Sequence, residues 1–335
     1  MKEGQTLQVH YKGMRINKNI YNQLGTLVIP TLSILTDNDI NFLYQQKVEL
    51  SNEDVEPAAV LELVDSAIKE VKDLFHTATY ADQISYTDVR EKIIPIIVFM
   101  SHHPNLSQIL AHLEHHDEYV YRHSIGVALI SKIIGRARGY DEEALDNITT
   151  AGFLHDIGKA KIPGEILKKP GKLTAEEYEL MKQHTIFGYE MIKQSIGIPE
   201  RNAFVALQHH EREDGSGYPF GLKGNQIDPY SKIVAVADVF HAMISKRVYK
   251  DPVPFYKVLQ ELSANVYGAL EPNITLSFLK RIMDMLIGNS VVLSNGLEGR
   301  IIMVSSHDPV HPVVEVEGGF IDLSKEQEIH LERIL

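Results

Sequence analysis

The chain has 335 residues, of which 44% are hydrophobic and 23% are charged, and its formal net charge is −12. This composition is typical of a globular protein long enough for two or three domains, and it excludes a low-complexity or highly charged disordered chain. The negative charge argues against binding to duplex DNA, because such binding needs many Lys or Arg side chains to neutralise phosphates.

The chain contains no cysteine, which excludes disulfides and thiolate metal sites and leaves imidazole and carboxylate groups as the strong metal ligands. Its apolar run at residues 93–100 is far shorter than the roughly 20 residues that a membrane span requires. The first residues carry no apolar segment after their charges and do not resemble a secretory signal. We therefore expect no membrane association and a cytoplasmic location.

Residues 1–55 combine short strand-like stretches, at residues 7–11 and 25–29, with one helical signal. Thr36, together with Asp39, can cap a short helix that continues through residues 40–43. We expect a small α+β module here, with a regulatory or structural role.

Residues 56–287 change to a helical pattern, in which apolar side chains recur at spacings of three and four. Gly139 and Gly158 end two of the expected helices, and the prolines at 163, 170 and 199 lie between helical segments. After Gly288 the period becomes that of strands, with hairpin signals at residues 295–296 and 318–319. The sequence thus predicts a mainly α chain, with a helical domain at 56–287 and a small β module at 288–335.

Several of the sixteen histidines lie in apolar surroundings, where an unpaired polar group is costly. Asp238 lies inside an apolar helical segment, and a buried carboxylate there needs a cationic partner. His155 and Asp156 end another apolar segment, and adjacent residues about 100° apart on a helix can address one metal from two sides or bridge to a second. The same apolar-to-polar boundaries carry His123, His184, His209 and His210.

These five histidines and two aspartates form a mixed imidazole and carboxylate set suited to two transition-metal ions, with Asp156 as the bridge. The alternative is that each histidine merely packs in the core and bonds to backbone, which explains any one of them better than all seven together. The doublets at 102–103 and 115–116 lie in polar surroundings, and we expect surface histidines there.

The order of these residues resembles the metal ligands of HD-domain phosphohydrolases. The segment HHEREDGSGYP at residues 209–219 is similar to the motif that gives the HD-GYP subgroup its name, and residues 237–250 resemble the helix that follows the last ligand. The resemblance covers roughly residues 105 to 270. It implies an HD-domain helical bundle with His123, His155, Asp156, His184, His209, His210 and Asp238 as metal ligands.

The resemblance also implies a function, namely hydrolysis of cyclic di-GMP to a linear dinucleotide or GMP by a metal-bridging hydroxide. The implied cofactors are two divalent ions, iron or manganese. Asp156 and Lys159 then act in catalysis, and Lys159, Tyr218, Arg247 and Lys250 contact the substrate. The alternatives are that Lys159, Arg247 and Lys250 lie on a solvent-exposed face and that Tyr218 only packs within its loop.

Two departures and two rival functions remain open. His241 stands where many relatives carry Asp, and Tyr119 stands where three-metal relatives carry Glu, so we expect two metals. In the family, the GYP loop is also linked to binding of signalling partners. The rival functions are a non-catalytic sensor of a cyclic dinucleotide and an HD-type phosphohydrolase for another nucleotide.

Overall fold

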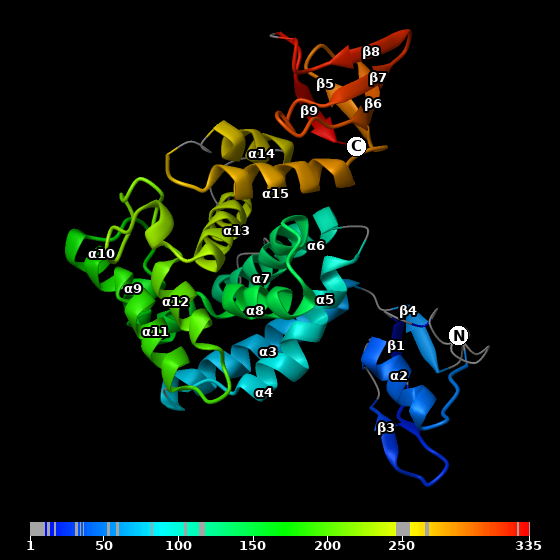
Figure 1. Ribbon diagram of the computed structural model, residues 1–335, viewed down its shortest axis with the longest axis vertical. Helices are drawn as coiled ribbons and strands as arrows, with labels where there is room; N and C mark the ends of the chain where they lie inside the picture. Colours follow the sequence, from blue (N-terminus) through cyan, green and yellow to red (C-terminus); the bar gives the residue numbers. More distant parts are fainter. Residues whose placement is uncertain are drawn as a thin grey trace.

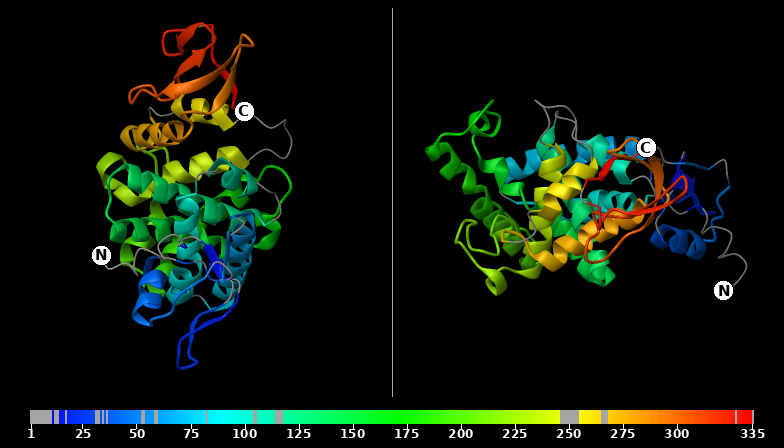
Figure 2. Two further views of the ribbon diagram at one scale, coloured as in Figure 1. Left: turned by 90° about the vertical axis from the view of Figure 1, so that its right-hand side faces the viewer. Right: turned by 90° about the horizontal axis from the view of Figure 1, so that it is seen from above.

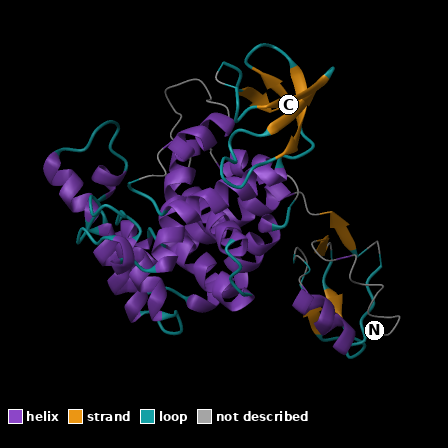
Figure 3. Cartoon of the chain, turned by 45° about the horizontal axis from the view of Figure 1, so that its top comes forward, coloured by secondary structure: helices purple, strands orange, loops and turns teal. Residues whose placement is uncertain are grey.

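The computed structural model is mainly helical, with a small β-containing module on either side of the helical body (Figure 1). It describes residues 11, 14–16, 18–30, 33, 35, 37–51, 54–57, 60–81, 83–103, 106–113, 118–245, 255–264, 268–326 and 328–334. Strands occur only in the two flanking modules of this described part (Figure 3). The expectation of a mainly α chain flanked by an α+β and a β module is confirmed.

The described residues of the N-terminal module form two strand pairs and one helix. Strand β1 (Met14–Ile16) pairs antiparallel with β4 (Val55–Pro57), and β2 (Ile20–Tyr21) pairs with β3 (Leu27–Ile29). Helix α2 (Asp37–Gln45) follows, as the sequence predicts. The strand expected at residues 7–11 lies outside the described residues except for Tyr11, and so does the expected cap Thr36. The module has its own apolar core, separate from that of the helices.

The helical body begins with a long helix and continues through α15. Its helices are α3 (Val60–Ala81), α4 (Tyr86–Asp88), α5 (Ile94–Ser101), α6 (Leu106–Leu113), α7 (Tyr119–Ala137), α8 (Glu142–Leu154), α9 (Gly164–Leu167), α10 (Ala175–Lys182), α11 (His184–Gln194), α12 (Glu200–Gln208), α13 (Pro229–Ser245), α14 (Phe255–Ala264) and α15 (Pro272–Met285). A π-helical turn (Val89–Ile93) and the 3-10 helices η3 (Ile157–Lys161) and η4 (Gly224–Gln226) complete it.

Helix α7 is the centre of this body. Every residue from 123 to 135 is buried, because α7 packs against α8, α13, α5 and α15 on different sides. A helix that is buried all round is usually apolar all round, but the buried part of α7 also contains His123, Ser124, Ser131 and Lys132. Polar side chains on α7 therefore lie in the interior of the protein.

Helix ends agree with the sequence prediction in part. Gly139 follows α7, and the three prolines lie at or between helix boundaries, whereas Gly158 lies inside η3, four residues after the end of α8. His184 lies at a break between two helices: α10 ends at Lys182 and α11 begins at His184, with Gln183 between them. The break has a consequence for the site, because it places His184 at the start of a helix.

The C-terminal module is a five-stranded antiparallel sheet in the order β8-β7-β6-β5-β9. Its strands are β5 (Ser290–Leu293), β6 (Glu298–Met303), β7 (Val313–Val316), β8 (Gly319–Asp322) and β9 (Leu331–Ile334), and both expected hairpin turns are confirmed. The sheet lies beyond α14 and α15 at one end of the molecule (Figure 1, and the left view of Figure 2). Its buried side chains join the core of the helical body, and the Tyr256 hydroxyl on α14 donates to the Val310 carbonyl.

No helix among the described residues is both long and apolar enough to span a membrane.

Candidate metal centre

The expected ligands come together because helices end or cross at one point. His155 and His209 are the residues that follow α8 and α12, and His184 is the first residue of α11. His123 and Asp238 lie inside α7 and α13, which pack against each other. Residues from five different helices thus converge on a single buried carboxylate, that of Asp156.

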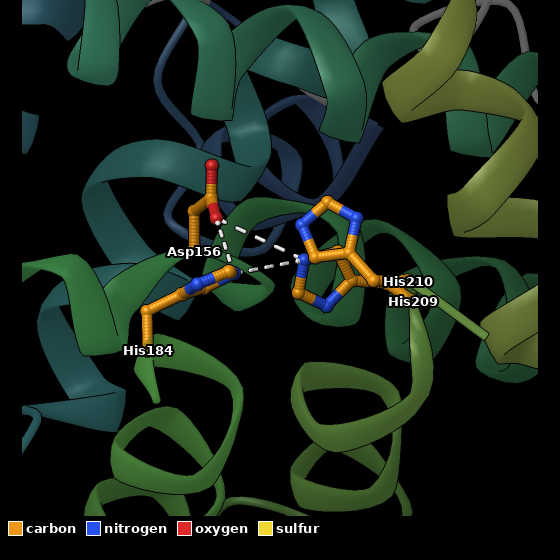
Figure 4. A group of neighbouring side chains, drawn as sticks. All are labelled: Asp156, His184, His209 and His210. Carbon is orange, nitrogen blue, oxygen red and sulfur yellow. Dashed lines mark hydrogen bonds and ion pairs between the residues drawn. The ribbon is translucent and has the colours of Figure 1, made fainter. Parts of the chain in front are cut away.

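One oxygen of Asp156 faces the histidines of α11 and α12 (Figure 4). Its Oδ1 lies 3.3 Å from Nε2 of His184 and 3.8 Å from Nε2 of His209, and these two nitrogens are 3.4 Å apart. Together with His210, this set has ligand atoms within 4.8 Å of one another, as a metal ion requires.

The other oxygen of Asp156 faces a second set. Its Oδ2 lies 3.2 Å from Nε2 of His155 and 3.7 Å from Nε2 of His123. Asp238 connects the two sets, since its Oδ1 is 3.0 Å from Nε2 of His123 and its Oδ2 is 3.8 Å from Nδ1 of His210. Asp156 therefore has the geometry of a bridging carboxylate, with one oxygen for each of two adjacent positions.

Three histidines are held in one tautomer by their own helices. Nδ1 of His155, His184 and His209 bonds to the carbonyl three residues earlier, at 2.7, 2.7 and 2.9 Å respectively. A carbonyl can only accept, so each Nδ1 carries the proton and each neutral ring presents its Nε2 lone pair to Asp156. This is the form in which histidine binds a metal.

The donor set fits divalent cations. His155 Nε2 and Asp156 Oδ1 are buried and have no hydrogen-bond partner among the described residues. An imidazole lone pair and a carboxylate oxygen repel each other unless a proton or a cation lies between them. Several such acceptors face one another here, so the arrangement is stable only with positive charge in its centre.

The pKa values agree with neutral histidines around ionised carboxylates. Burial lowers the pKa of His123, His209 and His210, and it lowers that of His184 to about 4. Burial acts in the same direction on His155, but the Asp156 carboxylate outweighs it and raises that pKa.

For the two carboxyl groups, burial alone would raise the pKa. Lys159 and His155 overcome it and hold the pKa of Asp156 well below its usual range. His123 does the same for the pKa of Asp238. The metal-free site therefore favours the protonation states that metal binding needs at the two carboxylates and at four of the five histidines, whereas the raised pKa of His155 favours its protonated form.

We expect the metal-free protein to lose stability as the pH falls from about 6.5 to about 4. The pKa of His184 is about 4 in the folded state and near 6.5 once unfolded, so between these values the unfolded state binds more protons. Each such histidine lowers the free energy of unfolding by up to about 1.4 kcal/mol per pH unit in that window. The pKa of His241 is also lowered by burial, whereas that of His155 is raised and opposes the trend.

Urea unfolding of chelated protein between about pH 7 and pH 4 measures this slope. The His184→Gln variant should show a shallower slope over the same range, because it removes one of these groups. Stability that is constant or rises on acidification would contradict the prediction.

Two of the residues expected to contact substrate lie beside the site. Lys159 Nζ lies 2.5 Å from Asp156 Oδ2, at the border of the site. Tyr218 stacks on the ring of His210, with centroids 4.6 Å apart and planes at 29°. Arg247 and Lys250 lie outside the described residues.

The loop that carries Tyr218 is packed tightly against the site. Glu211 is buried, and its carboxylate accepts the backbone N–H groups of Phe220 and Leu222 at 2.8 and 2.9 Å. A Cβ at Gly217 would lie 2.4 Å from the carbonyl oxygen of His210, so only glycine allows this approach. The loop thus forms one wall beside the candidate metal centre.

Sequence reasoning missed two residues beside this wall, Tyr178 and Lys182. The ammonium of Lys182 lies 5.5 Å from the ring centroid of Tyr178 and 5.8 Å from that of Tyr218, within the range of cation–π contacts. Tyr178 and Lys182 are four residues apart on α10, which places both on one face of that helix. Lys182 lies two positions before His184. That spacing was a signal that could have identified them.

The residues around the start of α7 have structural contacts. Tyr119 stacks on His123 with centroids 5.3 Å apart, and burial raises the pKa of its phenol. Glu118 forms an ion pair of 2.6 Å with Lys72. Among the expected surface histidines, His102 is exposed and His103 is half-buried, while residues 115–116 lie outside the described part of the chain.

Comparison with known proteins agrees with this site. Residues 104–273 match the protein family described as HD domain, and the chain belongs to that family. Within it, the motif at residues 209–219 and the order of histidines and aspartates are similar to those of the HD-GYP subgroup.

Curated relatives include two cyclic di-GMP phosphodiesterases that match this chain. The cyclic di-GMP phosphodiesterase of Thermotoga maritima is 44% identical over 168 residues, which cover 50% of this chain and 46% of that protein. The cyclic di-GMP phosphodiesterase PA4108 of Pseudomonas aeruginosa is 32% identical over 260 residues, covering 77% and 60%. The chain therefore matches about half to three fifths of the length of these relatives.

The fold has a solved counterpart. Bd1817, a HDG"Y"P protein from Bdellovibrio bacteriovorus, superposes with a TM-score of 0.51 at 17% identity, over 83% of this chain and 97% of that one.

Proposed function

We propose that this protein is a metal-dependent phosphodiesterase that hydrolyses cyclic di-GMP. The observation that carries the proposal is the bridging geometry of Asp156, whose two oxygens face two separate sets of histidines. The names of these two relatives, both cyclic di-GMP phosphodiesterases, support the choice of substrate, whereas other relatives are named 3'3'-cGAMP-specific phosphodiesterases.

We propose His123, His155, Asp156, His184, His209, His210 and Asp238 as ligands of two ions, iron or manganese. When bound, two such cations lower the pKa of a water molecule and neutralise charge on the phosphoryl group in an in-line displacement. Two ions rather than three agree with Tyr119, because a buried phenol of raised pKa is a poor ligand. Glu118 supports the same number, since its carboxylate pairs with Lys72.

The side chains around the metals supply the remaining functions. Lys159 lies at the open border of the site, where its ammonium can contact a substrate phosphate and stabilise developing negative charge. Tyr218, Tyr178 and Lys182 form an aromatic and cationic wall on which a base can stack. Arg247 and Lys250 belong to the proposal as further phosphate contacts, and the exposed Phe220 beside Tyr218 offers a surface for a signalling partner.

A turnover assay tests the function. Anaerobically purified protein loaded with Fe²⁺ or Mn²⁺ should contain two metal ions per chain and open cyclic di-GMP, with little activity on a generic phosphodiester. Tight binding of cyclic di-GMP without turnover would favour the sensor. Faster hydrolysis of a cyclic dinucleotide with another base would favour the phosphohydrolase for another nucleotide.

A further inference from the structure

His123 is held differently from the other histidines of the site. Whereas Nδ1 of His155, His184 and His209 bonds to a backbone carbonyl, Nδ1 of His123 lies 3.0 Å from Nδ1 of His241. The two residues are 118 positions apart in the sequence, and both rings are buried. Two ring nitrogens at this distance form a hydrogen bond in which one donates and the other accepts.

The direction of this bond follows from the other end of the His123 ring. Its Nε2 faces Asp238 at 3.0 Å and Asp156 at 3.7 Å, which is the position of the candidate metal centre. To bind a metal there, Nε2 must keep its lone pair, so the proton must be on Nδ1. Nδ1 of His241 must then be the acceptor.

Helix α13 supplies both partners of this ring. Asp238 and His241 are three residues apart and thus lie on the same helix face, one turn from each other. Asp238 approaches Nε2 of His123, and His241 approaches Nδ1. One turn of α13 therefore contacts both ring nitrogens of His123.

Gly126 makes room for this arrangement. It lies three residues after His123 on the same face of α7, and a Cβ at this position would be 2.0 Å from Nε2 and 2.1 Å from Cδ2 of His241. No side chain larger than hydrogen fits beneath the imidazole without displacing it. The lack of a side chain at Gly126 thus leaves the space that the imidazole of His241 occupies.

We propose that His241 is a positioning residue of the metal centre, which accepts a hydrogen bond from Nδ1 of His123 and so fixes the tautomer and orientation in which His123 binds metal. The inference rests on the proposed function, because it assumes that the site holds metal. His241 itself contacts neither substrate nor metal in this role.

Two substitutions of His241 separate positioning from packing. His241→Leu fills the space but removes the acceptor, whereas the amide oxygen of His241→Asn reaches the position of Nδ1. We expect the Leu variant to bind one of the two metal ions about 10- to 100-fold more weakly, as for the loss of other groups that orient metal ligands. The Asn variant should recover most of that affinity, and the second ion should be unaffected in both.

Titration of metal-free protein with Mn²⁺, monitored by calorimetry, measures the affinity for each metal ion without an activity assay. Gly126→Ala, which pushes the imidazole aside, should resemble His241→Leu. Wild-type affinity in His241→Leu would overturn the proposal, and so would equal losses in the Leu and Asn variants, which would indicate a metal ligand or a packing role. If wild-type protein binds two ions but does not hydrolyse cyclic di-GMP, the proposed function fails while the role of His241 stands.

Discussion

The Asp156→Asn variant is expected to lose both bound metals and turnover. The substitution keeps the shape of the side chain but removes the charge from a carboxylate whose two oxygens face two different sets of histidines. Loss of the metals removes several kcal/mol of transition-state stabilisation, and about 4 kcal/mol corresponds to a decrease of about 10³-fold in kcat/KM. Elemental analysis and the turnover assay together measure the effect.

A thermal readout makes this test independent of catalysis. Added metal should raise the melting temperature of the wild type, because a ligand that binds only the folded state stabilises it, and should leave that of Asp156→Asn unchanged. Asp146→Asn is the matched control: Asp146 is an exposed residue of α8 that pairs with Lys132 at 3.2 Å, far from the ligand set. Full metal content in Asp156→Asn would refute the assignment.

The Gly158→Ala variant is expected to lose stability and metal affinity at the same time. A Cβ at this position would lie 1.9 Å from the carbonyl oxygen of His184 and 2.4 Å from the amide nitrogen of Gly188. Both are backbone atoms, so η3 and the start of α11 must move apart. Overpacking of this kind costs about 1–3 kcal/mol, and the movement displaces His184 from Asp156.

Urea unfolding of metal-free protein measures the first effect, and titration with Mn²⁺ measures the second. Gly164→Ala is the control, because a Cβ at Gly164 has no neighbour within 4 Å. A variant with wild-type stability and metal affinity would show that η3 and α11 tolerate separation.

The sequence predicted the site where a polar side chain stands among apolar neighbours, because burial of such a side chain is costly. Polar side chains within apolar segments indicate a buried site without any knowledge of the fold. Asp238 and His155 are two examples. Glycine and proline marked the helix ends and the hairpins for similar local reasons. These features need only a few neighbouring residues to be recognised.

Contacts between distant segments could not be predicted in this way. Three features depend on tertiary packing: the pairing of β1 with β4, the hydrogen bond between His123 and His241, and the hydrogen bond from the Phe220 backbone N–H to the Glu211 carboxylate. The division between α10 and α11 at Gln183 was also missed, because no glycine or proline marks it. The domain boundaries at residues 55 and 287 remain predictions, although the sheet after α15 shares the core of the helices.

The contrast between the two ways of holding a histidine has a consequence for mutational tolerance. His155, His184 and His209 take their orientation from a carbonyl of the same turn, and every residue type supplies that carbonyl. Substitutions at residues 181 and 206 therefore leave the hydrogen bond intact as long as the turn persists, whereas a Cβ at Gly152 would lie 2.8 Å from Ser131 Oγ. His123 depends on a side chain from another helix and on a glycine beneath it. Divergent evolution of this site is thus expected to proceed through paired changes at positions 126 and 241, while the other three ligands stay oriented.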